Sequence, residues 1–316
     1  MDKKKLKIAF KLFMSCFFVG YLCLKVKVSA IAVALKGVDL IFYSLSTLIA
    51  VASTFFIAGK YYILIRQSPI KHSLLSLIKI NFISRFYALF LPSAVGREFI
   101  RWIKITRNQG GRAFFLACIL LERLTSIVVL LLCGTIPLLM HGTMPTIDTL
   151  KWRLLPWVVL ALMLCFLLLT FYVSAAVRSG VQSIVVRLLG RYANNFKVAS
   201  FFENFSLANI KASFYCAIIG LTLVWLIFYV ARLSVLIKAT DLPLNTVDIA
   251  WMGALVLLLQ TLPLSLAGIG LREGAYAYLF MLYKLPPENG VLIGVLFFSQ
   301  MLIMAAVGGV FELMER

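Results

Sequence analysis

The sequence predicts an all-α polytopic integral membrane protein, with about six full spans and two re-entrant helical hairpins arranged as an inverted-topology repeat. Apolar residues make up 62% of the 316 positions and charged residues only 14%. The basic residues gather in short segments between apolar runs, as in the positive-inside rule. Two of the apolar runs are interrupted by proline, glycine and an adjacent Arg-Glu pair. We expect a single membrane domain over residues 1–316, with pseudo-repeat halves at about 1–150 and 151–316.

The more distinctive interruption is LPLSLAGIGLREG at residues 262–274. Proline removes a backbone donor and glycine tolerates dihedrals that break a helix, so two half-helices are expected to meet here. The predicted break residues are Pro263, Gly268 and Gly270. Arg272 and Glu273 adjoin the break, and an ionisable group in a bilayer costs at least roughly 2.5–3.5 kcal/mol unless it is paired or hydrated. A tight loop at the membrane edge with a snorkelling arginine is the alternative interpretation.

A related segment, LPSAVGREFIR, occurs earlier at residues 91–101. It again combines Leu-Pro, a serine and a glycine with an adjacent Arg97 and Glu98. Basic loops flank residues 73–101 on both sides, so we expect this region to enter and leave the same face, with its bend at Pro92 to Gly96. Paired interrupted segments of this kind indicate a transporter's binding site, and they suggest an internal duplication.

The remaining apolar runs predict the topology of the chain. Full spans are expected at residues 8–24, 38–59, 113–140, 152–176, 213–237 and 291–311, and the second hairpin at 249–282. The second span should end at an inner boundary marked by Lys60, Tyr61, Tyr62 and Arg66. Residues 178–211 are read either as an amphipathic helix on the inner leaflet or as a solvated basic loop. Both termini are expected in the cytoplasm and residues 141–151 outside, in a bacterial-type cytoplasmic (inner) membrane. The first span looks like a retained helix and not a cleaved signal peptide.

The charged residues of the two motifs predict an anion-binding site near the midplane. Arginine donates two parallel hydrogen bonds to neighbouring phosphate oxygens, and helix N-termini add N–H donors. The expected binding residues are Arg97, Arg101, Arg123 and Arg272, with Ser93 and Ser265 beside them, and Glu98, Glu122 and Glu273 holding the arginines in register. The four arginines and three glutamates should share one partly wet cavity. The alternative is that these groups are structural ion pairs joining the hairpins to the bundle.

Composition argues against several other functions. The net charge of +19 is spread over short loops, so anionic lipid headgroups are the expected partners and nucleic acid is not. The six cysteines have no CxxC spacing, and the two histidines lie far apart, so neither a metal site nor a cofactor is expected. The 12 acidic residues form no recognisable catalytic cluster, and Asp148, Asp241 and Asp248 stand separately. The sequence therefore does not indicate an enzyme.

The chain also resembles a known family. FYALFLPSAVGREFIRWIKITR at residues 86–107, the Glu122-Arg123 pair and TLPLSLAGIGLREGAY at residues 261–276 are similar to the flippase-like transmembrane domain of lysylphosphatidylglycerol synthases and their stand-alone relatives. The resemblance covers nearly the whole chain. It implies movement of a lipid between leaflets, such as an aminoacylated phospholipid or a polyprenyl-linked sugar. The synthases carry a soluble aminoacyl-transferase domain after the membrane region, whereas this sequence ends at Arg316, so lysyl transfer is not implied. Glu98 directly follows Arg97 where the family is expected to show a small residue and then an acid, so the first motif matches more loosely.

The sequence-based hypothesis is therefore a flippase-like lipid translocase that moves an anionic phospholipid or a polyprenyl-phosphate-linked lipid. Two alternatives remain: a membrane-embedded transferase that acts on lipid-linked sugars or aminoacyl groups, or a non-transporting partner of such an enzyme. A lipid-modifying enzyme is a further candidate partner.

Overall fold

The computed structural model describes residues 36–66, 70–89, 94–107, 112–140, 145–173, 212–261 and 268–315. Every regular element in these ranges is a helix. The helices are α3 (Leu40–Ile65), α4 (Leu74–Ala88), α5 (Ala94–Thr106), α6 (Arg112–Met140), α7 (Pro145–Val173), α10 (Ala212–Lys238), α11 (Thr246–Thr261), α12 (Leu271–Leu282) and α13 (Pro287–Met314). The predicted span at 8–24, the segment 178–211, and the residues Pro92, Ser93, Pro263 and Ser265 lie outside the described residues.

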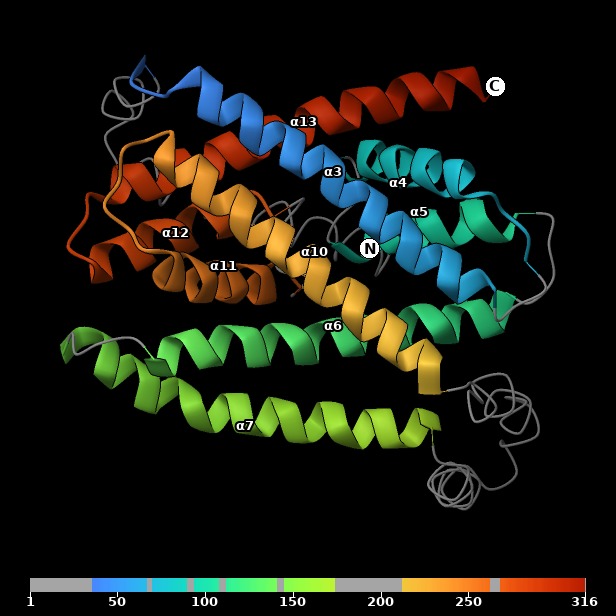
Figure 1. Cartoon of the computed structure of the whole chain (residues 1–316), viewed down its shortest axis with the longest axis horizontal. Coiled ribbons are helices and arrows are strands. Elements are labelled where there is room, and N and C mark those ends of the chain that lie inside the picture. Colours follow the sequence, from blue (N-terminus) through green and yellow to red (C-terminus); the bar gives the residue numbers. More distant parts are fainter. Residues whose placement is uncertain are drawn as a thin grey trace, which may run out of the picture.

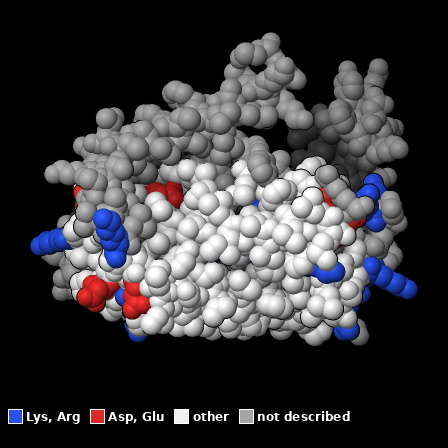
Figure 2. Space-filling view, turned by 90° about the horizontal axis from the view of Figure 1, so that it is seen from above, with Lys and Arg blue, Asp and Glu red and all other residues white. Residues whose placement is uncertain are grey.

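Four of the described helices are long and apolar enough to cross a membrane: α3, α6, α10 and α13. They run roughly along the long axis of the molecule, and α7 packs beside α6 (Figure 1). Figure 2 shows charged side chains gathered at the two ends, with uncharged residues covering the band between them. An uncharged band of this kind suits the hydrocarbon region of a bilayer. The chain is therefore a multi-pass membrane protein.

Local capping interactions set where several helices begin. The Asp39 carboxylate accepts a hydrogen bond from the Ile41 amide at 2.7 Å at the start of α3. The Ser73 hydroxyl accepts one from Ser76 at 3.2 Å at the start of α4. These contacts satisfy amide groups that have no partner within the helix.

Two pairs of short helices lie at opposite ends of the bundle (Figure 1). The pair α4 and α5 lies at the end where α3 and α13 finish, which we call the α4–α5 end. The pair α11 and α12 lies at the other, called the α11–α12 end. At 1.5 Å per residue these four helices are about 18–24 Å long, which is shorter than the roughly 30 Å hydrocarbon core.

Glycines allow the short helices to pack closely against the long ones. A Cβ atom at Gly308 of α13 would lie 2.0 Å from the carbonyl oxygen of Phe82 in α4. A Cβ at Gly134 of α6 would lie 2.8 Å from the Ala254 Cβ in α11. Small residues at helix interfaces are typical of membrane proteins because packing is a main source of helix association in lipid. Thus α4 packs closely against α13, and α11 packs closely against α6.

Three boundaries differ from those expected from sequence. Helix α3 continues to Ile65, so Lys60 and Tyr61 are buried inside the bundle and are not anchors at its boundary. Burial is possible because Lys60 finds a carboxylate partner, Glu122, on a helix remote in sequence. Gly96 lies in the first turn of α5, so it is not part of the break between α4 and α5. Helix α7 begins at Pro145, within the expected outer loop, because proline is well suited to the first turn of a helix.

The apolar core is divided into two clusters. One joins α3, α4 and α6 toward the α4–α5 end, and is centred on residues such as Leu64, Leu77 and Phe115. The other joins α10, α11, α12 and α13 toward the α11–α12 end, and includes Trp251 and Phe280. Many of the buried charged residues belong to neither cluster. They line a cavity to which both halves of the bundle contribute.

Candidate functional site

A cavity of about 230 Å³ opens inside the bundle. Its lining comes from every described helix except α7, and combines apolar side chains such as Ile57, Leu130 and Phe297 with many charged groups. The charged lining residues are Lys60, Arg85, Arg97, Arg101, Arg123, Arg232 and Arg272, together with Glu98 and Glu122. Among the described residues, seven basic and two acidic side chains thus line the cavity.

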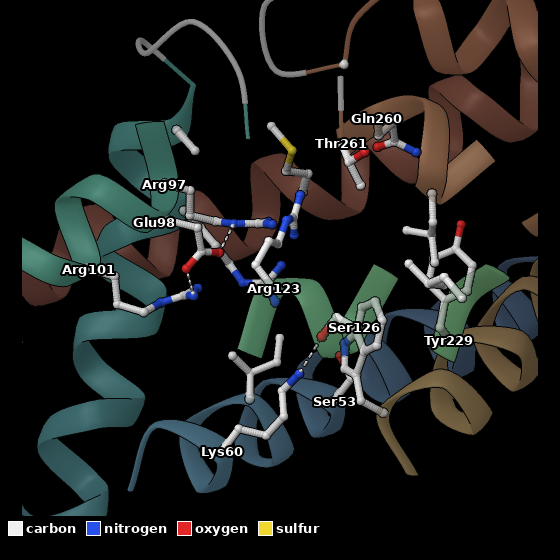
Figure 3. Close-up of a pocket in the computed structure, with 18 of the residues that line it drawn as sticks. Ser53, Lys60, Arg97, Glu98, Arg101, Arg123, Ser126, Tyr229, Gln260 and Thr261 are labelled. Atoms are coloured by element: carbon white, nitrogen blue, oxygen red, sulfur yellow. Dashed lines mark hydrogen bonds and ion pairs between the residues drawn. The ribbon is translucent and has the colours of Figure 1, made fainter. Parts of the chain in front are cut away.

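The cavity is deep within the apolar part of the protein. Glu122 and Arg123 lie about 15 Å along α6 from its beginning, at 1.5 Å per residue. Their helix is 29 residues long, so both groups lie well inside it. In Figure 3, Arg97, Glu98 and Arg101 approach from α5, Arg123 from α6 and Lys60 from α3. Charges at this depth require partners or water.

The first polar cluster joins α3, α6 and α10. Lys60 forms an ion pair with Glu122 and donates to the hydroxyls of Ser126 and Thr222, each at 3.3 Å. The Ser126 hydroxyl also donates to Glu122 at 2.8 Å. The Lys60 ammonium lies 5.8 Å from the centre of the Trp225 ring, within the range of a cation–π contact. Lys60 is thus held by four groups from two other helices.

The second cluster joins α3 to α5. Arg101 donates to the Glu98 carboxylate at 2.6 Å and to the Tyr61 hydroxyl at 2.7 Å, and Tyr61 donates to the same carboxylate. The Arg101 guanidinium also lies over the Tyr61 ring, 4.5 Å from its centre. Arg97 is less well placed, since its Nε is 3.9 Å from Glu98. Glu98 therefore pairs mainly with Arg101.

The third cluster lies at the beginning of α12, where Gly268 and Gly270 both adopt positive φ. The Glu273 carboxylate accepts the Gly270 amide at 2.7 Å and pairs with Arg272 at 2.6 Å. Glycine is suited to this backbone because a side chain would be strained at positive φ. Glu273 thus caps the helix and orients Arg272, whose side chain reaches the cavity lining.

Arg232 of α10 forms no ion pair with a carboxylate of the described residues. Its guanidinium donates two hydrogen bonds to the Gln300 side-chain oxygen, at 2.8 and 2.5 Å, and lies 4.1 Å from the centre of the Phe297 ring. The Gln300 amide in turn donates to Ser46 at 3.0 Å. A neutral amide orients Arg232 but leaves its charge uncompensated.

Two further arginines have little to neutralise them. Arg85 of α4 donates to the Thr54 hydroxyl at 3.3 Å. The positive charges of Arg97, Arg101 and Arg232 act on it, and the negative charge of Glu98 opposes them only in part. Arg123 forms no ion pair or hydrogen bond with any residue that the structure describes. The cavity wall is therefore strongly electropositive.

The structure brings together most of the residues predicted from sequence. Arg97, Glu98, Arg101, Glu122, Arg123 and Arg272 line one cavity, and Glu273 pairs with Arg272 beside it. Gly268 also lines the cavity and Gly270 begins α12. Ser93 and Ser265 lie outside the described ranges, so their predicted role is unchanged.

Sequence reasoning missed three basic residues of the cavity: Lys60, Arg85 and Arg232. Arg232 lies within the predicted span 213–237, and an arginine inside a span is by itself a sign of a functional site. Arg85 lies within the first predicted hairpin and carries the same signal. Lys60 adjoins Tyr61, Tyr62 and Arg66, so in sequence it looks like an ordinary interface anchor.

Within the described part of the chain, no group of three or more His, Cys, Asp or Glu side chains is arranged to hold a metal ion. The arrangement instead provides guanidinium groups, one ammonium and the beginning of a helix around a partly apolar space. Such donors bind oxygen atoms that carry negative charge, as in phosphates.

Comparison with known proteins identifies the family of the chain. No curated protein and no solved structure matches the chain significantly. A family model described as the lysylphosphatidylglycerol synthase TM region matches residues 8–309. Since this match covers nearly all of the sequence, including both interrupted motifs and every charged residue of the cavity, the chain belongs to the family of lysylphosphatidylglycerol synthase transmembrane regions.

Proposed function

We propose that this protein is a lipid translocase, which carries a lipid with an anionic headgroup between the leaflets of the cytoplasmic membrane. The observation that carries the proposal is the cavity deep within an apolar bundle, which is lined, in the part of the chain that the structure describes, by seven basic and two acidic side chains. Unpaired positive charge in such a place is costly. An anionic headgroup would supply the missing charge.

The donors around the cavity suit phosphate oxygens. Arginine presents a planar fork that can donate two parallel hydrogen bonds to neighbouring oxygens, which a lysine cannot reproduce. Arg97 lies in the first turn of α5, and Arg272 in the first turn of α12. The N-terminus of a helix carries partial positive charge and free amide groups, so both positions favour an anion.

The arrangement of the helices supports an inverted repeat with two re-entrant hairpins. Exchanging α3 with α10, α4 and α5 with α11 and α12, and α6 with α13 relates some of the helix contacts to one another, although the extensive packing of α12 on α13 has only a slight counterpart between α5 and α6. The packing of α4 on α13 then corresponds to that of α11 on α6. The two short pairs enter from opposite ends (Figure 1). In transporters built this way, the substrate site lies between the halves, and rocking of one part against the other exposes it to each side.

The basic loops favour a cytoplasmic location for the α4–α5 end. Arg66, Lys71, Arg107 and Arg112 flank the helices that begin or finish there. By the positive-inside rule this end faces the cytoplasm, which places the C-terminus there. The α11–α12 pair then enters from the outside.

Transport by reconstituted protein tests the proposal. Purified protein would be placed in vesicles containing fluorescent phosphatidylglycerol, and the fraction of label exposed to an external quencher would be followed with time. Arg272→Ala should abolish protein-dependent movement, and Arg272→Lys should restore only part of it because a point charge cannot make the bidentate contact.

The matched control is Lys238→Ala, which removes an exposed basic residue at the end of α10. This variant should transport as the wild type does. Unaltered transport by Arg272→Ala would contradict a role for the cavity. Aggregation of Arg272→Ala, with normal insertion of Arg272→Lys and unchanged transport, would instead show that the Arg272–Glu273 pair serves only to hold the fold.

A further inference from the structure

We infer that the lipid headgroup bound in the cavity carries at least two negative charges on its phosphate, as a phosphomonoester or diphosphate does. This inference rests on the proposed function and specifies its substrate class. It separates such lipids from phosphodiesters, which carry one phosphate charge, and from zwitterionic or aminoacylated lipids, whose headgroups add positive charge.

The charge balance of the cavity carries the argument. Three of its basic residues have carboxylate partners of their own: Lys60 with Glu122, Arg101 with Glu98, and Arg272 with Glu273. Of the other four basic lining residues, only Arg97 forms an ion pair with a described carboxylate, and that carboxylate, Glu98, is 3.9 Å away and already paired with Arg101. These four are Arg85, Arg97, Arg123 and Arg232. The seven positive charges and three negative ones therefore leave an excess of four.

The partners of these four arginines are weak or neutral. Arg85 donates to a threonine hydroxyl and Arg232 to an amide oxygen. Arg97 is 3.9 Å from Glu98, and its buried Nε has no hydrogen-bond partner within the described structure. These contacts orient the guanidinium groups without removing their charge. A buried donor without a partner requires an explanation, and a binding site for an ion or water is one.

The four arginines also approach from four different helices: α4, α5, α6 and α10. A single phosphodiester presents two non-bridging oxygens, and one bidentate arginine can contact both. Such a ligand would leave most of the cavity's donors without an acceptor, and it would neutralise only a small part of the excess positive charge. A terminal phosphate has three non-bridging oxygens and nearly two charges at neutral pH, and a diphosphate has more of each. The larger number of acceptor oxygens suits arginines that approach the cavity from several sides.

The same balance disfavours an aminoacylated phospholipid. Esterification with lysine adds two ammonium groups to a phosphodiester, so the headgroup becomes cationic. Its ammonium groups would need acceptors in a cavity where the two lining carboxylates are already engaged by Lys60 and Arg101. Like charges held together in a medium of low dielectric repel strongly.

Binding and transport by the full-length protein distinguish these classes. The probes are fluorescent phosphatidic acid, phosphatidylglycerol and phosphatidylcholine with identical acyl chains, and a short-chain polyprenyl diphosphate. We expect phosphatidic acid and the diphosphate to bind at least about tenfold more tightly than phosphatidylglycerol, the size of effect that one additional charge-assisted hydrogen bond produces. Phosphatidylcholine should bind more weakly still.

A pH series provides a second readout that needs no variant. The second proton of a phosphomonoester leaves with a pKa near 6, so phosphatidic acid gains charge between pH 5 and pH 8 whereas phosphatidylglycerol does not. The ratio of the two affinities should therefore rise with pH. Because both lipids are measured on the same protein, the ratio corrects for titration of the protein's own groups.

A variant that removes one positive charge then tests whether the preference for phosphatidic acid arises in the cavity. Arg232→Gln should reduce the preference for phosphatidic acid over phosphatidylglycerol by several-fold, whereas Lys238→Gln on the same helix should leave it unchanged. If Arg232→Gln does not insert, Arg123→Gln serves the same purpose, and the ranking of lipids by the wild type is decisive without either.

The outcomes separate this inference from the proposed function. Equal binding of phosphatidic acid and phosphatidylglycerol, with Arg272-dependent movement of either, would overturn the inference and leave lipid translocation intact. A preference for the zwitterionic lipid would also overturn it. If the folded protein neither binds nor moves any of the four lipids, the proposed function itself fails.

Discussion

Removing the Glu122 carboxylate should strongly destabilise the substrate-free protein, because it leaves Lys60 buried without its counter-charge. The two side chains are only 5% and 10% exposed, so water can do little to replace the lost partner. Breaking a buried ion pair by removing one member typically costs about 3–5 kcal/mol. The change made is Glu122→Gln, which keeps the size and shape of the side chain.

The expected magnitude lies near the lower limit of that range. Lys60 would keep its hydrogen bonds to Ser126 and Thr222, which stabilise its charge in part. The cavity, however, would lose one of its two lining carboxylates and become more positive. We therefore expect a loss of about 3 kcal/mol. For a chain of this length that corresponds to a decrease in melting temperature on the order of 5 °C or more.

The measurement is thermal unfolding in detergent, followed by fluorescence at several protein concentrations. Glu288→Gln at the beginning of α13, outside the cavity, is the matched control and should change the melting temperature little. The double variant Lys60→Met with Glu122→Leu removes both charges, and should regain most of the lost stability because a buried pair can be replaced by apolar side chains at little cost. An unchanged melting temperature for Glu122→Gln would refute the buried pair. A double variant as unstable as Glu122→Gln would show that the loss is steric and not electrostatic.

Three further predictions follow from the fold. Gly308→Ala should prevent normal folding, because its Cβ would lie 2.0 Å from a backbone oxygen. Gly220→Ala should be tolerated, because a Cβ there would meet nothing within 4 Å. Size-exclusion profiles of the two variants would show the difference. Cysteines introduced at Arg107 and Thr146 should react with an impermeant thiol reagent from opposite sides of the membrane, and labelling of both from one side would contradict the proposed topology. Burial and the hydrogen bond to the Asp248 carboxylate raise the pKa of Tyr283, whose hydroxyl therefore remains a donor at neutral pH. The variant Tyr283→Phe should lower the free energy of unfolding by roughly 1–3 kcal/mol, measured by thermal unfolding. An unchanged melting temperature would contradict this anchoring role.

The sequence by itself determined the class of the protein and much of its helical layout. Long apolar runs predict spans because a helix in lipid must satisfy its own backbone groups, and the described spans α3, α6, α10 and α13 follow those runs closely. The break before α12 was also predictable, since Gly268 and Gly270 adopt the positive φ that glycine favours. Such features depend on a few neighbouring residues.

Only the tertiary structure decided which charges meet. Lys60 looks like an interface anchor in the sequence, but it is buried against Glu122 from a helix about sixty residues away. Arg85 and Arg232 are conspicuous in apolar runs, yet nothing in the chain indicates that they line the same cavity as Arg97 and Arg272. The physical reason is that a residue's electrostatic environment depends on distances in space, which are set by how helices remote in sequence pack together.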